Sequence, residues 1–121
     1  MADKLTSRQK AQLAVLETLP PKIEHMHRLI EEIAGMRPDE TVTRRLCRIL
    51  DETKVAVNSV GMNALSETMG IMGTLARRTS GIQMKIRGLR EGLGSLKINY
   101  EGALRSATTE EVDESGKPLA T

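Results

Sequence analysis

Apolar residues recur at helical spacing along most of the chain, and the most regular run lies between residues 82 and 104. Its large apolar positions advance in alternating steps of four and three residues, at Ile82, Ile86, Leu89, Leu93, Leu96 and Tyr100. This spacing places them on one stripe of a helix, the kind of seam by which one helix packs along another. The run therefore predicts a helix over residues 80–106 that packs lengthwise against a second helix.

Small residues form a second repeat in the same helix. Gly81, Gly88, Ser95 and Gly102 recur every seven residues, roughly 120° around the helix from the apolar seam. Glycine in a helix interior costs up to about 1 kcal/mol relative to alanine, so a helix with this many glycines depends on packing. The glycine file predicts close approach of another helix, and the alternative is a flexible helix face without a special contact.

Three shorter or weaker patterns precede this helix and predict helices over residues 6–19, 21–36 and 39–78. Thr6 and Gln9 fit a capping box at the first start. Pro20 and Pro21 are expected to separate the first two helices, because proline cannot donate a backbone hydrogen bond. The third helix meets no proline and is expected to run unbroken, with local bends at its glycines such as Gly61.

The connection between the last two predicted helices is the residue run 79–81. Ser80 and Gln83 form another candidate capping box there, and the alternative is one continuous rod over residues 39–106. Beyond Ser106 the apolar pattern stops and acidic residues dominate, so residues 107–121 are expected to form a disordered acidic tail. The fold class expected is all-α: a single domain over residues 1–106, built as an elongated helical bundle or long helical hairpin with coiled-coil-like packing.

The composition narrows the functional classes. The 121 residues include one Tyr and neither Phe nor Trp, and a small-molecule pocket is less favoured without aromatic side chains. The lone Cys47 excludes an intramolecular disulfide and points to a reducing compartment, cytoplasmic or nuclear. Residues 1–10 are too polar for a signal peptide, and the most apolar window, residues 55–75, contains polar side chains that argue against a membrane span.

The charges are unevenly distributed. The net charge of +2 divides into −1 for residues 1–40, +6 for residues 41–106 and −3 for residues 107–121. The basic side chains fall in two groups, Arg44, Arg45 and Arg48, and then Arg77, Arg78, Lys85, Arg87 and Arg90. The second group is the candidate anion-binding set, for phosphate or an acidic protein surface. The alternative is a solvated helix face, and the acidic tail is a candidate shield for it.

No catalytic or metal-binding pattern is complete. Glu24 and His27 have the spacing of a helical iron-ligand pair, but a di-iron site needs a second such element and only His25 remains. Cys47 lies beside Arg45 and Arg48, which favour a thiolate, yet no histidine is placed to serve as its base. The glycines lack the ending of a phosphate-binding loop. We therefore expect no enzyme activity, no cofactor and no small-molecule substrate.

The predicted helices are unequal in length, and short helices cannot cover the apolar faces of long ones. Uncovered stripes need partners, so we expect association with a protein partner or self-association through the long helices. The alternative is packing within the chain. The candidate partner-binding residues are Ile82, Ile86, Leu89, Leu93, Leu96, Tyr100, Gly81, Gly88 and Gly102. The sequence predicts a non-enzymatic interaction module, a subunit, adaptor or small regulator; the alternative is a nucleic-acid-associated helical protein.

Overall fold

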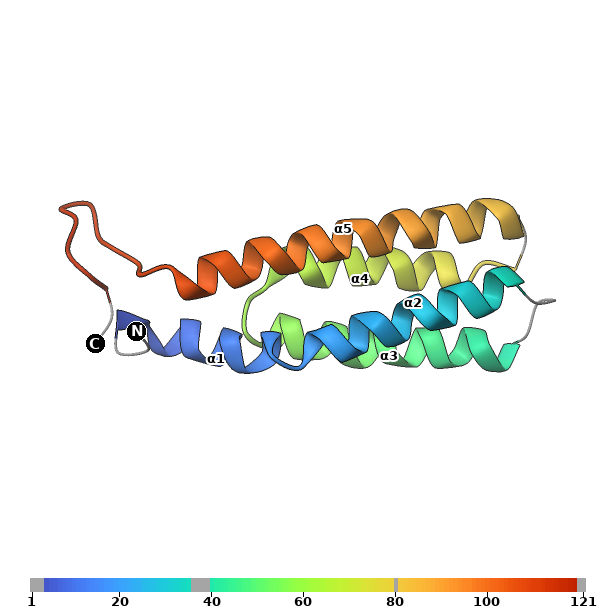
Figure 1. The fold of residues 1–121 in the computed structure, drawn as a ribbon, viewed down its shortest axis with the longest axis horizontal. Coiled ribbons are helices and arrows are strands. Elements are labelled where there is room, and N and C mark those ends of the chain that lie inside the picture. The colour runs from blue at the N-terminus through green and yellow to red at the C-terminus, as the bar shows by residue number, and fades with distance from the viewer. Residues whose placement is uncertain (1–3, 36–39, 80, 120–121) are drawn as a thin grey trace.

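The computed structural model describes residues 4–35, 40–79 and 81–119. These residues form five helices: α1 (Ser7–Leu16), α2 (Leu19–Gly35), α3 (Glu40–Ser59), α4 (Asn63–Ala76) and α5 (Ile82–Thr108). The all-α class expected from the sequence is confirmed. Figure 1 shows an elongated bundle in which α1 and α2 run in one direction, α3 returns, α4 runs forward again and α5 returns along the whole length.

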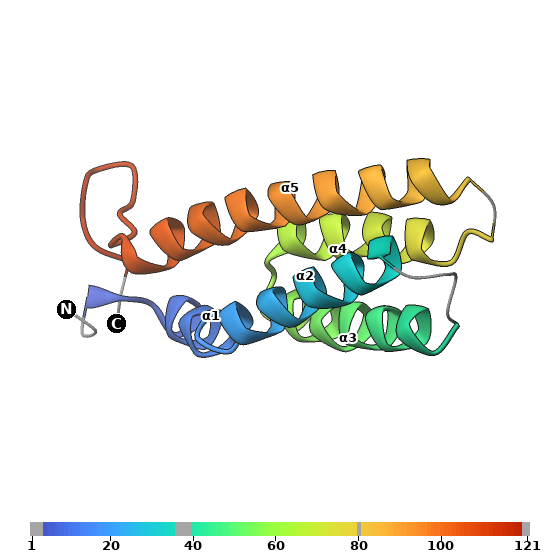
Figure 2. The ribbon, with the colours of Figure 1, turned by 45° about the vertical axis from the view of Figure 1, so that its right-hand side comes forward.

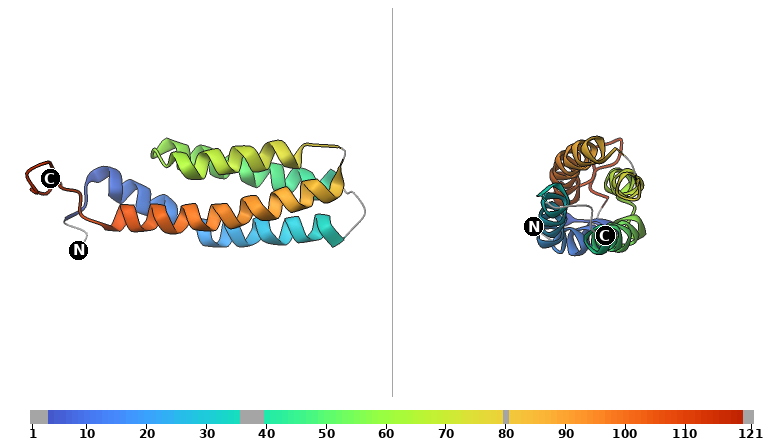
Figure 3. Two further views of the ribbon diagram at one scale, coloured as in Figure 1. Left: turned by 90° about the horizontal axis from the view of Figure 1, so that it is seen from above. Right: turned by 90° about the vertical axis from the view of Figure 1, so that its right-hand side faces the viewer.

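The helices enclose one core. α2 contacts α3 and α5, and α4 contacts the same two helices, so four helices surround the bundle axis (Figure 3, right). Beyond the turn where α3 ends and α4 begins, α1 and the last turns of α5 continue as a pair (Figure 2; Figure 3, left). The largest fully buried apolar side chains are Leu16, Leu19, Met26, Ile30, Leu46, Leu50, Leu65, Met69, Met72, Leu89 and Leu96. Aliphatic and methionine side chains therefore fill the core.

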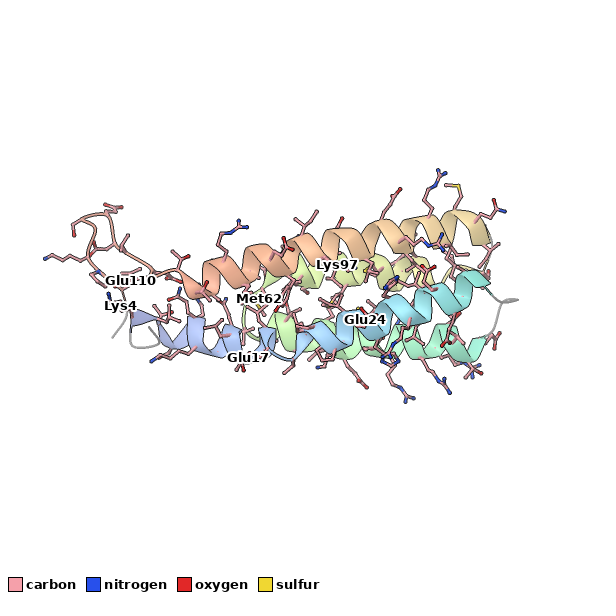
Figure 4. The ribbon with its side chains drawn as sticks, viewed as in Figure 1. Lys4, Glu17, Glu24, Met62, Lys97 and Glu110 are labelled. Atoms are coloured by element: carbon pink, nitrogen blue, oxygen red, sulfur yellow. The ribbon has the colours of Figure 1, made fainter. Side chains whose placement is uncertain are left out.

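The helix expected over residues 39–78 is wrong, because the chain reverses at Gly61. The Met62 N–H donates to the Val57 carbonyl at 3.0 Å, and the Gly61 N–H donates to the Asn58 carbonyl at 3.1 Å. With φ +75° at Gly61, these two bonds make a Schellman motif, which ends a helix in a left-handed residue. Met62 is buried beyond it and lies among the helices in Figure 4. α3 and α4 are thus an antiparallel hairpin.

The other predicted boundaries hold in part. The capping box is present, because the Gln9 N–H donates to Thr6 Oγ1 and the Thr6 N–H donates to Gln9 Oε1. Pro20 and Pro21 lie in the first turn of α2, where a missing N–H costs nothing, so the break falls earlier than expected, after Leu16. The interruption before α5 is confirmed at Gly81, the N-cap residue, with φ +68°. The candidate cap at Ser80 lies outside the described residues.

The acidic C-terminal segment folds back on itself among the described residues. α5 runs on to Thr108, and residues 109–119, here named the acidic loop, contain an isolated bridge between Val112 and Pro118. The Asp113 carboxylate accepts from the N–H groups of Ser115 and Lys117, both at 2.9 Å. The expected disorder is not confirmed. Lys4 and Glu110 lie at the same end of the molecule (Figure 4).

Candidate functional site

The apolar seam of α5 faces the chain's own core. Leu89, Leu93 and Leu96 are 0%, 5% and 0% exposed, while Ile86 and Tyr100 are partly buried and pack against the same core. Of the six seam residues, only Ile82, at the start of the helix, is exposed, at 39%. The structure therefore corrects the intermolecular interpretation of the three leucines: the bundle itself covers them, and they are not a surface that a partner can reach.

Two glycines on α5 allow close packing of a neighbouring helix. Only one of them, Gly88, belongs to the seven-residue repeat; the other is Gly92. A Cβ atom at Gly88 would lie 2.9 Å from Leu75 Cδ1, and one at Gly92 would lie 2.6 Å from Met72 Cγ. Side chains of α4 therefore rest on the bare backbone of α5 at these two positions. Gly102, in contrast, has nothing within 4 Å. Gly81 is the N-cap in the left-handed region.

The predicted basic run divides between two places. Arg77, Arg78 and Lys85 line one cleft, named here the end cleft. Arg87 and Arg90 line a separate, smaller hollow. Arg90 donates twice to the Glu31 carboxylate, at 2.9 and 2.7 Å, and these hydrogen bonds hold the pKa of Glu31 below its ordinary value. The candidate anion-binding set is therefore not one surface.

The end cleft lies between the beginning of α3, the end of α4 and the beginning of α5, and encloses about 770 Å³. One face of α3 supplies residues at spacings of three and four: Glu40, Thr43, Arg44, Cys47, Arg48, Asp51 and Glu52. Ala76, Arg77, Arg78, Thr79, Ile82 and Lys85 complete it. This volume falls within the usual range of binding pockets, and the lining combines five basic and three acidic residues with a few apolar ones.

Unequal helix lengths account for this cleft. α3 has 20 residues and α4 has 14, so α3 extends roughly 9 Å beyond its neighbour at 1.5 Å per residue. The two helices lie close together at Gly70, where an added Cβ would lie 3.1 Å from Lys54 Nζ, and Arg77, just after α4, bonds Asp51 of α3 at 2.6 Å. The first turns of α3 are therefore not covered by α4, and their side chains on that side form one wall of the cleft.

The charged side chains of the end cleft differ in how they are held. Arg77 pairs with Asp51, and Arg44 pairs with Glu40 at 3.1 Å, both in exposed ion pairs that contribute little stability and exchange readily. Lys85 is only 8% exposed, and its Nζ donates to the Arg78 carbonyl at 2.9 Å. Its ammonium thus adds a fixed positive charge beside the apolar side chain of Ile82.

No group of three or more His, Cys, Asp or Glu side chains in the described ranges is arranged to hold a metal ion. Within those ranges, too, every helix is too short or too polar to cross a membrane. The basic residues of the cleft were evident in the sequence, but the cleft itself was not. The available signal was the spacing of Arg44, Cys47 and Asp51, which share one face of α3.

The fold defines the class: an all-α bundle whose four walls reverse direction at each connection, with an open basic and apolar cleft at one end. Comparisons with protein-family models, with curated proteins and with solved structures found no match.

Proposed function

We propose that the protein is a non-enzymatic helical interaction module that acts as a subunit, adaptor or small regulator of a larger assembly. The observation that carries the proposal is the end cleft, an open groove whose wall along α3 is three turns long. A groove of mixed apolar and charged lining suits an extended or helical protein segment. We also infer coiled-coil-like packing of α5 inside the bundle, supported by the buried seam at Leu89, Leu93 and Leu96.

The contact surface in this proposal differs from the one that the sequence indicated. Ile82 is the one seam residue that is both exposed and part of the end cleft, so it is the residue through which the expected partner contact is retained. A reducing cytoplasmic or nuclear compartment is part of the proposal, because the lone Cys47 is half-buried and cannot form an intramolecular disulfide.

The test is affinity capture of the tagged chain, followed by reconstitution with the captured protein and measurement of the complex mass by light scattering. We expect a complex of fixed stoichiometry that is lost in Ile82→Glu, because a carboxylate replaces the apolar side chain in the groove. The matched control is Ile98→Glu, the same change at a 71% exposed position on α5 outside the end cleft. A partner retained equally by both variants, or no partner at all, contradicts the proposal.

A nucleic-acid-associated role is the second candidate, and one observation favours it. Arg44, Arg48 and Lys85 meet in the same cleft as Arg77 and Arg78, which concentrates positive charge from three helices. With no Phe or Trp in the chain, such binding would depend on phosphate contacts and would weaken steeply with salt. A gel shift at low salt that disappears near physiological salt supports this role, and the absence of any shift removes it.

A further inference from the structure

One end of the molecule carries the acidic loop, and the other carries the end cleft, in which basic residues outnumber acidic ones. The acidic loop follows the last turn of α5, whereas the end cleft contains the first turn of the same helix. In Figure 1 the loop lies at the left end and the α4–α5 connection at the right. α5 has 27 residues, so about 40 Å of helix separates the two features at 1.5 Å per residue.

This distance prevents the loop from filling the cleft of its own chain. The acidic residues Glu110, Glu111, Asp113 and Glu114 follow within six residues of the helix end at Thr108. Six residues of fully extended chain reach at most about 20 Å. The chain's own acidic residues therefore cannot reach Arg77, Arg78 and Lys85 in the end cleft while α5 is intact, which removes the shielding that the sequence left open for these three residues.

The acidic loop is a preformed shape rather than a loose end. Its turn is held by the Asp113 carboxylate, which accepts from two backbone N–H groups, and by the Leu119 N–H, which donates to the Glu111 carbonyl at 2.8 Å. The turn presents Val112, which is 53% exposed, among the acidic side chains. A short apolar side chain flanked by carboxylates is thus displayed at the end of the molecule.

The end cleft offers the complementary features. Its five basic residues outnumber its three acidic ones, and two of those acids already pair with Arg44 and Arg77. Arg48, Arg78 and Lys85 therefore leave the cleft with an excess of positive charge, and Ile82 supplies an exposed apolar contact.

Two polar contacts tie the loop to the helices: the Gln9 Nε2 hydrogen bond to the carbonyl of Thr109, its first residue, at 2.6 Å, and the Arg8–Glu111 ion pair at 2.9 Å, whose side chains are 66% and 28% exposed. A solvated ion pair of this kind contributes little stability. Residues 110–114 can therefore exchange that ion pair for several charge-assisted contacts in a cleft, which favours the exchange.

We propose that the end cleft of one molecule binds the acidic loop of a second copy of the chain. The proposal rests on the proposed function in that it uses the same cleft, and it names the occupant. The contact joins different surfaces of the two molecules, so association is head-to-tail and open-ended unless the rotation between copies closes a ring. Its strength falls with added salt, because charge complementarity drives it.

The test uses two full-length charge-reversal variants. The cleft variant carries Arg48→Glu and Arg78→Glu, and the loop variant carries Glu110→Lys and Glu114→Lys, which spares Asp113 and its turn. We expect the parent chain to show a light-scattering mass that starts at 13.3 kDa and rises with concentration at low salt, while each variant alone stays at the single-chain mass. Circular dichroism checks that both variants keep the helical fold.

Mixing the two variants gives the decisive result. The cleft variant keeps an intact loop and the loop variant keeps an intact cleft, and the two reversed surfaces are also opposite in charge, so an equimolar mixture is expected to regain the association that each variant lacks alone. The matched control, Arg45→Glu with Arg87→Glu, reverses two exposed arginines outside the end cleft and should associate like the parent chain. A symmetric dimer or unspecific aggregation does not produce this complementation.

Three outcomes overturn the inference: a parent chain that stays at 13.3 kDa up to millimolar concentration at low salt, variants that still associate, or a mixture that stays monomeric while the parent associates. These outcomes are separate from the test of the proposed function. A chain that does not self-associate but loses a captured protein on Ile82→Glu disproves the head-to-tail contact and leaves the interaction module standing. A chain that does neither disproves both.

Discussion

Gly92 and Gly94 are close neighbours on α5 with opposite surroundings. A Cβ atom at Gly92 would lie 2.6 Å from Met72 Cγ, whereas one at Gly94 would meet nothing within 4 Å. Met72 is fully buried in the core, so it has little room to move aside. The glycine at position 92 is therefore required by the packing of α4 on α5, and the glycine at position 94 is not.

Alanine at these two positions is expected to change the free energy of unfolding in opposite directions. Gly94→Ala should raise the free energy of unfolding by up to about 1 kcal/mol, the difference in helix propensity. Gly92→Ala gains the same propensity but overpacks against Met72, at a cost of about 1–3 kcal/mol, so its stability should fall. Urea unfolding with equal m-values measures both changes. A rise in Gly92→Ala as large as that in Gly94→Ala would show that α4 does not rest on this position.

At the level of the helix, Gln9 ties the beginning of α1 to the end of α5. Its Nε2 donates to the carbonyls of Ser106 and Thr109 at 3.1 and 2.6 Å, and its Oε1 accepts from the Thr6 N–H at 2.9 Å. The side chain is 1% exposed. One residue thus caps α1 and also satisfies carbonyls at the end of α5, which a helix leaves unpaired.

Replacing this side chain should loosen the paired end of the molecule. Gln9→Ala leaves the Thr6 N–H and two α5 carbonyls without their partner, so we expect the free energy of unfolding to fall by about 1–3 kcal/mol. Amide hydrogen exchange should quicken first in α1, before the core helices. The control is Lys10→Ala, an exposed neighbour on the same helix, expected within about 0.5 kcal/mol of the parent. Unchanged exchange in α1 would contradict this role for Gln9.

The end of α3 illustrates how a helix boundary depends on a tertiary contact. Glycine at position 61 is visible in the sequence, and a bend was the natural expectation. What turns a bend into a reversal is the buried position of Met62 and the Gln12 side chain, whose Nε2 donates to the Val60 carbonyl at 3.0 Å. Gln12 belongs to α1, and the burial of Met62 depends on the assembled core. The pattern of residues 39–78 contains Met62 but shows neither its burial nor the Gln12 contact.

At the scale of the whole molecule, the α5 seam holds the bundle together. Leu89 is 0% exposed, and α5 contacts α1, α2 and α4. A carboxylate placed there is buried without a cation and costs several kcal/mol, a large share of the 5–15 kcal/mol typical of a domain. We therefore expect Leu89→Asp to unfold the chain, rather than to leave a folded protein that has lost a partner.

Thermal unfolding followed by circular dichroism tests this expectation, which should appear as loss of the cooperative transition. Ile98→Asp makes the same change at a 71% exposed position of α5 and should keep the transition. A Leu89→Asp protein that stays folded but changes mass would restore the seam as an intermolecular surface.

The sequence by itself determined that the chain is helical, roughly where its helices lie, and which side of each is apolar. The three- and four-residue spacing of apolar positions and the Thr6–Gln9 cap each involve residues close together in the sequence, so both can be recognised without the tertiary structure. The sequence also identified Arg77, Arg78, Lys85, Arg87 and Arg90 as one basic group, of which the structure brings only the first three together in the end cleft. It identified the seam as a packing surface without identifying what packs on it.

Only the tertiary structure decided which surface covers which. The reversal at Gly61 brings α4 back against α3 and α5, so the chain itself buries the stripe that had suggested an external partner. The same reversal leaves α4 shorter than α3, which opens the end cleft. The hydrophobic effect is not directional, so an apolar stripe does not specify which surface covers it. The helix lengths and the direction of each turn decide which helix packs on which, and neither follows from the periodicity of apolar residues.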